Sequence, residues 1–308
     1  MSREDWVFIA IIVIIAVIPL TGSRFYIFLF TDIMIFGLFA VSLNLLIGYT
    51  GLVSFGHAAY FGIGCYTCAL LIKKASLPFG IAFAATGVFG AASALLIGFF
   101  CVRLTKIYFA MLTLAFSQIV WAIVFKWNAL TGGDTGIYGI DFPKFIDSKI
   151  RYFYFTLAIV TVSLFILRKI VSSPFGRILA TIRDNPERTE FIGINVKLFQ
   201  LIAFIISGFF SAIAGGLFAV FNHSVFPDFA HWPVSAEVLI MTLLGGMYSF
   251  FGPMVGAGVL LYLRLESTSY TEYWPFILGT ILCIILFFAP GGIVGFIQDR
   301  IARWGSSK

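Results

Sequence analysis

Few side chains in this sequence are placed to do acid–base chemistry inside its long apolar runs. Three ionisable residues fall within such runs, namely Asp32, His57 and Glu237. Ionisable groups at membrane depth are often the proton or sodium sites of ion-coupled carriers. Asp32 and Glu237, however, fall near the predicted ends of their runs, where a carboxylate reaches water. We therefore interpret both as solvated helix-end groups, and a carrier or channel that works without an ATPase stays an alternative function.

The other chemically versatile residues lack the spacing that catalysis or metal binding needs. Cys65 and Cys68 form C-x-x-C in the middle of an apolar run, which favours a packing role over a redox pair. The histidines His57, His223 and His231 have no metal-ligand spacing. No G-x-x-x-x-G-K-[ST] segment occurs, so nothing here is typical of a phosphate-binding loop. We predict no catalytic residue, no metal and no cofactor in this chain.

The elements that must position these residues are membrane helices. Of the 308 residues, 60% are hydrophobic and 11% are charged, and the mean hydropathy is +1.03; a water-soluble fold of this length cannot bury so much apolar surface. The apolar runs reach about 20 residues without alternation, which fits helices rather than barrel strands. The net charge of +6 comes from short loops, so it predicts orientation in the membrane and no nucleic-acid partner.

We predict an all-α polytopic membrane protein with one transmembrane domain over residues 1–308 and ten spans, or nine if residues 234–263 form a single helix. The predicted spans are 6–20, 26–47, 52–72, 79–102, 107–126, 152–169, 198–221, 234–248, 251–263 and 275–297. The first has acidic residues before it and no small-residue cleavage site after it, so it counts as a span. Segment 168–200 carries six Lys and Arg residues, which is typical of a cytoplasmic loop. Counting ten spans from this segment places both termini in the cytoplasm.

Two polar, glycine-containing breaks interrupt the apolar pattern near residues 48–56 and 245–252. Ser54-Phe55-Gly56 in the first has a loose echo in Ser249-Phe250-Phe251-Gly252 in the second. Such broken helices surround the substrate in many transporters, so the two breaks are predicted to face each other across a pathway. For His57, a hydrogen-bonding role at a helix start is favoured over substrate contact. The predicted pathway and gate residues are Asn44, Tyr49, Gly51, Ser54, Phe55, Gly56, His57, Tyr60, Gly246, Ser249 and Phe250.

The basic segment 172–197 contains two helix starts. Ser173 is placed to cap a helix that begins at Pro174, and Asn185 is placed to cap a second one that begins at Pro186. Gly193 supplies the stop. The sequence therefore predicts a cytoplasmic loop with two short helices lying under the bundle. Such a loop fits a groove in a partner protein, and an amphipathic connector resting on lipid headgroups is the simpler alternative.

Three stretches of the sequence resemble those of a known family. They are FGRILATIRDNPERTEFIGINVKLFQLIAFIISGFFSAIAGGLFA from residue 175, LNLLIGYTGLVSFGHAAYFGIGCYT at 43–67 and TGGDTGI at 131–137. Together they closely resemble the LivM-type permeases of branched-chain amino-acid ABC transporters, over residues 26–297. The resemblance implies that segment 172–197 docks into a cleft of a partner ATPase. Phe191 and Ile192 depart from the small residues that often stand there in the family.

The resemblance also implies the partners and the residues that meet them. We expect a homologous LivH-type permease, two ATPase subunits that bind ATP and Mg, a soluble amino-acid-binding protein outside the cell, and a bacterial or archaeal cytoplasmic (inner) membrane. The residues expected to couple to the ATPase are Arg177, Arg183, Asn185, Pro186, Glu187, Arg188, Glu190 and Gly193. Those expected on the binding-protein side are Thr131, Gly132, Gly133, Asp134, Lys144 and Lys149. Leucine, isoleucine and valine are the expected substrates, and urea, short amides or nucleosides are alternatives on the same scaffold.

Overall fold

The computed structural model describes residues 15–140, 148–270, 276, 279, 280, 283 and 291–296. Five described helices are long and apolar enough to cross a membrane: α2 (Arg24–Thr50), α4 (Phe79–Cys101), α5 (Lys106–Lys126), α7 (Lys149–Ser172) and α10 (Val196–Phe221). The chain is therefore an all-α, multi-pass membrane protein, as predicted. Most of the predicted spans 6–20 and 275–297, and both termini, lie outside the described residues. The number of ten spans and the location of the termini stay predictions.

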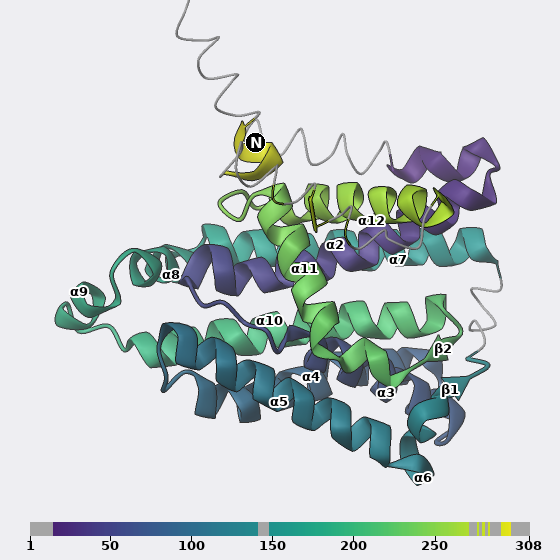
Figure 1. The fold of residues 1–308 in the computed structure, drawn as a ribbon, viewed down its shortest axis with the longest axis horizontal. Helices are drawn as coiled ribbons and strands as arrows, with labels where there is room; N and C mark the ends of the chain where they lie inside the picture. Colours follow the sequence, from purple (N-terminus) through teal and green to yellow (C-terminus); the bar gives the residue numbers. More distant parts are fainter. Residues whose placement is uncertain are drawn as a thin grey trace, which may run out of the picture.

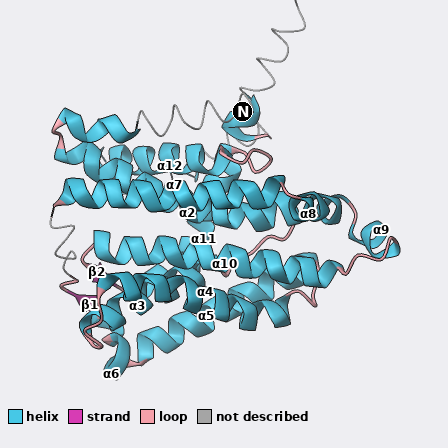
Figure 2. Cartoon of the chain, turned by 180° about the vertical axis from the view of Figure 1, so that it is seen from behind, coloured by secondary structure: helices cyan, strands magenta, loops and turns pink. Residues whose placement is uncertain are grey.

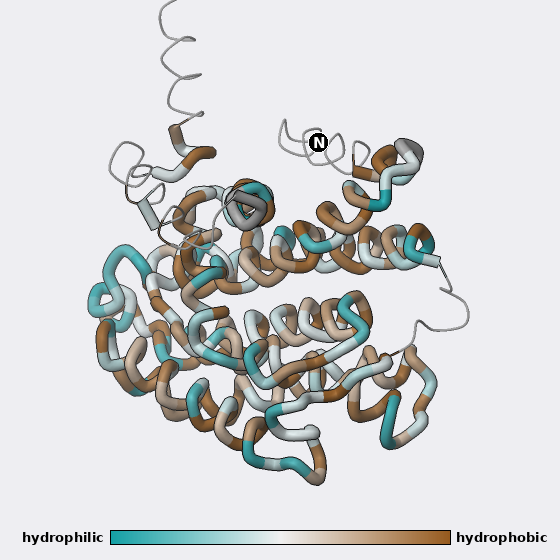
Figure 3. Tube along the Cα trace, turned by 45° about the vertical axis from the view of Figure 1, so that its right-hand side comes forward, coloured by the Kyte–Doolittle hydropathy of each residue, from teal (hydrophilic) through white to brown (hydrophobic). Residues whose placement is uncertain are grey.

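The long helices form a layered bundle with α10 at its centre (Figures 1 and 2). In both views α2, α7 and α12 (Gly252–Tyr270) lie on one side of α10, and α3 (His57–Lys73), α4 and α5 lie on the other. α10 packs directly against α2, α3 and α4. Hydrophobic residues run along the helices, whereas hydrophilic residues gather in the connections between them (Figure 3). This distribution is the one expected of helices that meet lipid along their length.

Small residues allow the central helices to approach closely. A Cβ placed on Gly215 of α10 would collide with the carbonyl oxygen of Phe61 in α3, and one placed on Gly90 of α4 would collide with the side chain of Ala212 in α10. Small residues recur every four positions in α4 (Gly90, Ala94, Gly98) and in α10 (Ser207, Ser211, Gly215). The contacts explain this spacing, because helices in lipid associate through close van der Waals packing. The Cys65 thiol donates to the Gly215 carbonyl at 3.1 Å. It therefore belongs to this packed interface.

The first break is shorter than the sequence predicted. α2 continues through Thr50, and the Leu52 N–H donates to the Leu46 carbonyl at 3.1 Å. Gly51 follows in the left-handed conformation with φ of 73°, which is the usual way to end a helix. Gly48 and Tyr49, predicted to lie in the turn, belong to the last turn of α2. The third span was predicted to begin at residue 52, but α3 starts only at His57.

The second break separates two distinct helices. α11 (Trp232–Gly245) ends at Gly245, and α12 begins at Gly252. Gly246, with φ of 112°, adopts a backbone conformation that L-residues rarely adopt. The alternative of one helix over residues 234–263 is therefore wrong. α11 crosses obliquely between the layers (Figure 1).

Short elements close the two ends of the bundle. At one end, here called the α8 end, are α8 (Pro174–Asp184) and α9 (Pro186–Phe191). At the other, the β1 end, are α6 (Asn128–Thr131), η2 (Gly133–Thr135), β1 (Ile137–Tyr138), β2 (Ser224–Val225) and η4 (Pro227–Ala230). β1 and β2 are antiparallel, with Ile137 opposite Val225. η1 (Ile18–Thr21) precedes α2.

Candidate functional site

Two short helices begin in the interior of the bundle and touch at their starts. The Ala58 N–H, in the first turn of α3, donates to Ser235 Oγ, in the first turn of α11, at 2.7 Å. The segment that leads into α3 is held in the same way, because the Phe55 N–H donates to Thr113 Oγ1 at 3.2 Å and the Gly56 N–H to Ser54 Oγ at 3.3 Å. Hydroxyl groups thus satisfy backbone donors that no water or helix partner would satisfy at this depth.

His57 connects the start of α3 to the two neighbouring long helices. Its side chain is fully buried, with Nε2 at 3.1 Å from Ser42 Oγ of α2 and 3.2 Å from Ser207 Oγ of α10. The imidazole also stacks on Phe39, with 5.6 Å between the ring centroids. Tyr60, another predicted pathway residue, is buried against His57. Both side chains therefore contact protein and do not line either described cavity.

The second break contacts α2 at the α8 end, and the two breaks are not equivalent. Asn44 Nδ2 of α2 donates to the Ser249 carbonyl at 3.3 Å. Ser249 lies in the tight turn between α11 and α12, together with Gly246 and Phe250, whereas Ser54 is buried where the chain enters the bundle. The two similar serine-containing segments therefore occupy different positions in the structure. The helix start that meets the start of α3 is that of α11, at Trp232-Pro233. The sequence feature that could have identified it is the proline in the first helical turn.

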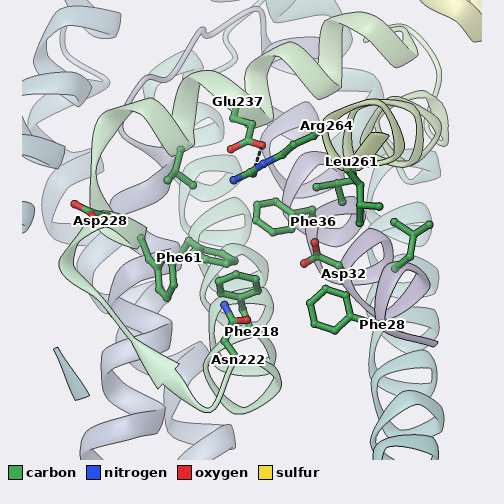
Figure 4. Close-up of a pocket in the computed structure, with 14 residues that line it drawn as sticks. Phe28, Asp32, Phe36, Phe61, Phe218, Asn222, Asp228, Glu237, Leu261 and Arg264 are labelled. Carbon is green, nitrogen blue, oxygen red and sulfur yellow. Dashed lines mark hydrogen bonds and ion pairs between the residues drawn. The ribbon is translucent and has the colours of Figure 1, made fainter. Parts of the chain in front are cut away.

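A cavity of about 680 Å³ opens on the β1 side of these helix starts. Its walls come from α2, α3, α10, α11, α12 and η4, and Figure 4 shows the side chains that project into it. They are Phe28, Leu29, Asp32, Phe36, Phe61, Phe218, Asn222, Asp228, Phe229, Val234, Glu237, Leu261, Arg264 and Leu265. Its volume is in the range of small-molecule sites, which are mostly apolar with a few converging polar groups.

Three of the four charged groups of the cavity converge from three helices, and the fourth, Asp228, lies on η4. Arg264 Nη1 of α12 forms an ion pair with Glu237 Oε1 of α11 at 2.8 Å. Asp32 of α2 lies close enough to interact electrostatically with both, and its Oδ1 is buried with no hydrogen-bond partner among the described residues. Sequence reasoning named Asp32 and Glu237 but treated each as a helix-end group. It missed Arg264, whose partner lies on another helix.

The predicted coupling segment has one of its two expected helix caps. Ser173 precedes α8, but its hydroxyl makes no capping hydrogen bond and donates instead to the Ile170 carbonyl at 2.6 Å. Asn185 Oδ1 accepts from the Arg188 N–H at 2.9 Å, and Gly193, with φ of 87°, follows the end of α9. Most of the predicted coupling side chains are exposed, namely Arg177, Asn185, Pro186, Glu187, Arg188 and Glu190. Phe191 and Ile192 are 90% and 70% exposed. Two large apolar side chains are therefore exposed at the tip of the α8 end.

Arg183 is the coupling residue that turns inward. Its Nη1 donates to the Gly48 carbonyl at the end of α2 at 2.6 Å. The guanidinium also lies 5.4 Å from the centroid of the Tyr248 ring, in the turn between α11 and α12. One side chain of α8 thus contacts both breaks.

The predicted binding-protein side is a set of tight turns at the β1 end. Thr131 Oγ1 donates to the Val124 carbonyl at 2.6 Å, and Gly132 and Gly133 both have positive φ. Asp134 is exposed next to them. Lys149 lines a second cavity of about 620 Å³ between α2, α7 and α10. Lys144 lies outside the described residues.

Comparisons with known proteins agree with this architecture. Residues 25–288 match the family model described as branched-chain amino acid transport system / permease component. The high-affinity branched-chain amino acid transport system permease protein LivM of Escherichia coli is 28% identical, over 97% of this chain and 77% of its own length. Two proteins of Methanocaldococcus jannaschii are also similar. The probable branched-chain amino acid transport permease protein LivM is 24% identical over 84% of this chain and 91% of its own length, and the corresponding LivH is 23% identical over 86% and 90%. No solved structure matches the chain.

Proposed function

The chain belongs to the family of permease components of branched-chain amino acid transport systems, and on this basis we propose that it is a membrane subunit of an ATP-driven importer of leucine, isoleucine and valine. The observation that carries the proposal is the family match over residues 25–288, together with the similarity to LivM over 97% of the chain. In this role the chain is not an enzyme. It forms half of a translocation pathway, and a separate ATPase binds ATP and Mg.

The α8 end is the proposed contact with the ATPase and the cytoplasmic face. Its support is the pair of short helices α8 and α9, the exposed Phe191 and Ile192, and the hydrogen bond from Arg183 to the end of α2. A movement of α8 would reach both breaks through Arg183 and would bias the bundle between two arrangements. The β1 end would then face outward and receive substrate from a soluble binding protein, in the cytoplasmic membrane of a bacterium or archaeon.

The second half of the pathway is proposed to come from a LivH-type permease. This chain is itself similar to LivH of Methanocaldococcus jannaschii, so one scaffold would serve both halves. Pairing with a homologue uses two related interfaces, as in other pseudo-symmetric assemblies. Copurification of this chain with a second, different permease would show a heterodimer.

Purification and reconstitution test the function directly. The tagged chain, purified from the cells that naturally produce it, is expected to copurify with a second permease and an ATPase. In proteoliposomes the complex is expected to take up leucine only with ATP and a leucine-loaded binding protein. Uptake by this chain alone, without an ATPase, would support an ion-coupled carrier instead. Stimulation by a urea-, amide- or nucleoside-loaded protein, with none by leucine-, isoleucine- or valine-loaded proteins, would contradict the proposed substrates.

A further inference from the structure

We infer that the cavity on the β1 side binds its substrate as a zwitterion, with Arg264 facing the carboxylate and Asp32 facing the ammonium group. This inference rests on the proposed function and deepens it, because it assigns the two charged ends of an amino acid to named residues. The predicted gate residues line neither described cavity, whereas Asp32, Glu237 and Arg264 project into this one (Figure 4).

Asp32 has the chemistry of an ammonium site. Its Oδ1 is buried and has no hydrogen-bond partner among the described residues, although it lies in the wall of the cavity. A buried acceptor without a donor is costly, and such groups are rare in folded proteins. An ammonium group brings three N–H donors and a positive charge, and it would satisfy this oxygen from the cavity side.

Arg264 has the chemistry of a carboxylate site, and Glu237 positions it. An arginine side chain presents five N–H donors in a planar fork, so it can serve Glu237 and a second carboxylate together. The ion pair with Glu237, at 2.8 Å, holds the guanidinium over the cavity (Figure 4). Lysine would keep the charge but lose the fork. The guanidinium and the Asp32 carboxylate thus offer opposite charges from different helices.

The rest of the wall suits an aliphatic side chain. Phe28, Phe36, Phe61 and Phe218 line the cavity, and Leu261 and Val234 are among the aliphatic residues that add to its apolar surface. Burial of apolar surface against these residues would favour leucine, isoleucine or valine over a polar amino acid. Urea, an amide or a neutral nucleoside lacks at least one of the two charged ends. It would leave the Asp32 carboxylate without a substrate ammonium or Arg264 without the substrate carboxylate, and the lost contact costs about 10-fold in affinity or more.

The test uses the complete transporter in proteoliposomes with a leucine-loaded binding protein, and it measures leucine imported per ATP hydrolysed. The variants Asp32→Asn and Arg264→Lys are conservative, and the second keeps a cation beside Glu237. Each is expected to lower the ratio about 10-fold, because hydrolysis at the ATPase continues while the substrate is poorly held. Glu266→Gln is the matched control, since Glu266 is an exposed carboxylate on the same helix and lies outside the cavity. Its ratio is expected to equal that of the wild type.

The outcomes separate the inference from the proposed function. If the wild-type complex imports no leucine, the proposed function fails. If it imports leucine and both variants keep the wild-type ratio, the function stands and the zwitterion site is wrong. If a variant loses hydrolysis and import in proportion, its residue has a structural role, which also overturns the inference. A fall in the ratio for both variants, with a normal control, supports it.

Discussion

Arg183 Nη1 lies 2.6 Å from the carbonyl oxygen of Gly48, so a helix outside the bundle holds the last turn of a helix within it. The contact answers a local need of the backbone, because the carbonyls in the last turn of α2 have no helical partner of their own. A cation at a helix C-terminus is also favoured by the helix dipole. The guanidinium also lies over the ring of Tyr248, which belongs to the break between α11 and α12. The described structure therefore offers a direct physical link between α8 and both breaks.

Removal of this link is expected to uncouple the transporter. Arg183→Ala loses a charge-assisted hydrogen bond and a cation–π contact, together about 2–3 kcal/mol. Basal ATP hydrolysis is expected to remain, whereas its stimulation by loaded binding protein and leucine uptake should both fall several-fold. Arg103→Ala is the matched control, because Arg103 is an exposed arginine outside α8 and α9, and it should keep wild-type stimulation and uptake. An Arg183→Ala transporter that keeps wild-type stimulation and uptake would contradict the coupling role.

The exposed pair at the tip of the α8 end is expected to anchor the ATPase. Phe191 and Ile192 are 90% and 70% exposed, and large apolar groups at the centre of an interface supply much of its binding energy. The double variant Phe191→Ser with Ile192→Ser should lower the amount of ATPase that copurifies about 10-fold or more while leaving the permease folded. Tyr138→Ser, which removes an exposed aromatic ring at the opposite end, should leave copurification unchanged. Equal recovery of ATPase with the double variant would show that the anchor lies elsewhere.

The sequence predicted most of the helices because their signals are local. Runs of apolar residues mark α4, α5, α7 and α10. The prolines Pro174 and Pro186 mark the starts of α8 and α9, although of the two predicted caps only Asn185 makes its hydrogen bond. The end of α2 was less accurate. Gly48 was predicted to lie in a turn, but the helix passes through it and stops only at Gly51, because that residue alone adopts positive φ here.

The cavity could not be predicted in the same way, because its residues meet only after folding. Glu237 and Arg264 are 27 residues apart, and each alone looks like a polar residue near a helix end. The contact between the starts of α3 and α11 is also tertiary, since Ala58 and Ser235 are separated by 177 residues. The sequence identified which residues were polar within apolar runs. It could not show which of them share one space.

The buried His57 network is expected to stabilise the assembled bundle. His57→Ala removes an imidazole that contacts Ser42, Ser207 and Phe39, and it leaves a cavity and two hydroxyl groups without this partner. Loss of packing and hydrogen bonds of this size costs about 2–4 kcal/mol, which should appear as a lower thermal melting temperature in detergent. Ser42→Ala should have a smaller effect. If the two substitutions together cost as much as the sum of their separate costs, the hydrogen bond between them contributes nothing.

The close contact between α3 and α10 is expected to exclude any side chain at Gly215. A Cβ at this position would collide with the Phe61 backbone carbonyl, which cannot move aside as a flexible side chain can. Gly215→Leu should therefore separate the helices and abolish the monodisperse peak in size-exclusion chromatography. Gly80→Leu is the matched control, because Gly80 lies in α4 and a Cβ added to it would have no other atom within 4 Å. It should elute like the wild type, and leucine there could gain stability since it favours a helix over glycine by about 1 kcal/mol. A normal elution profile for Gly215→Leu would mean that α3 and α10 pack less closely than this structure indicates.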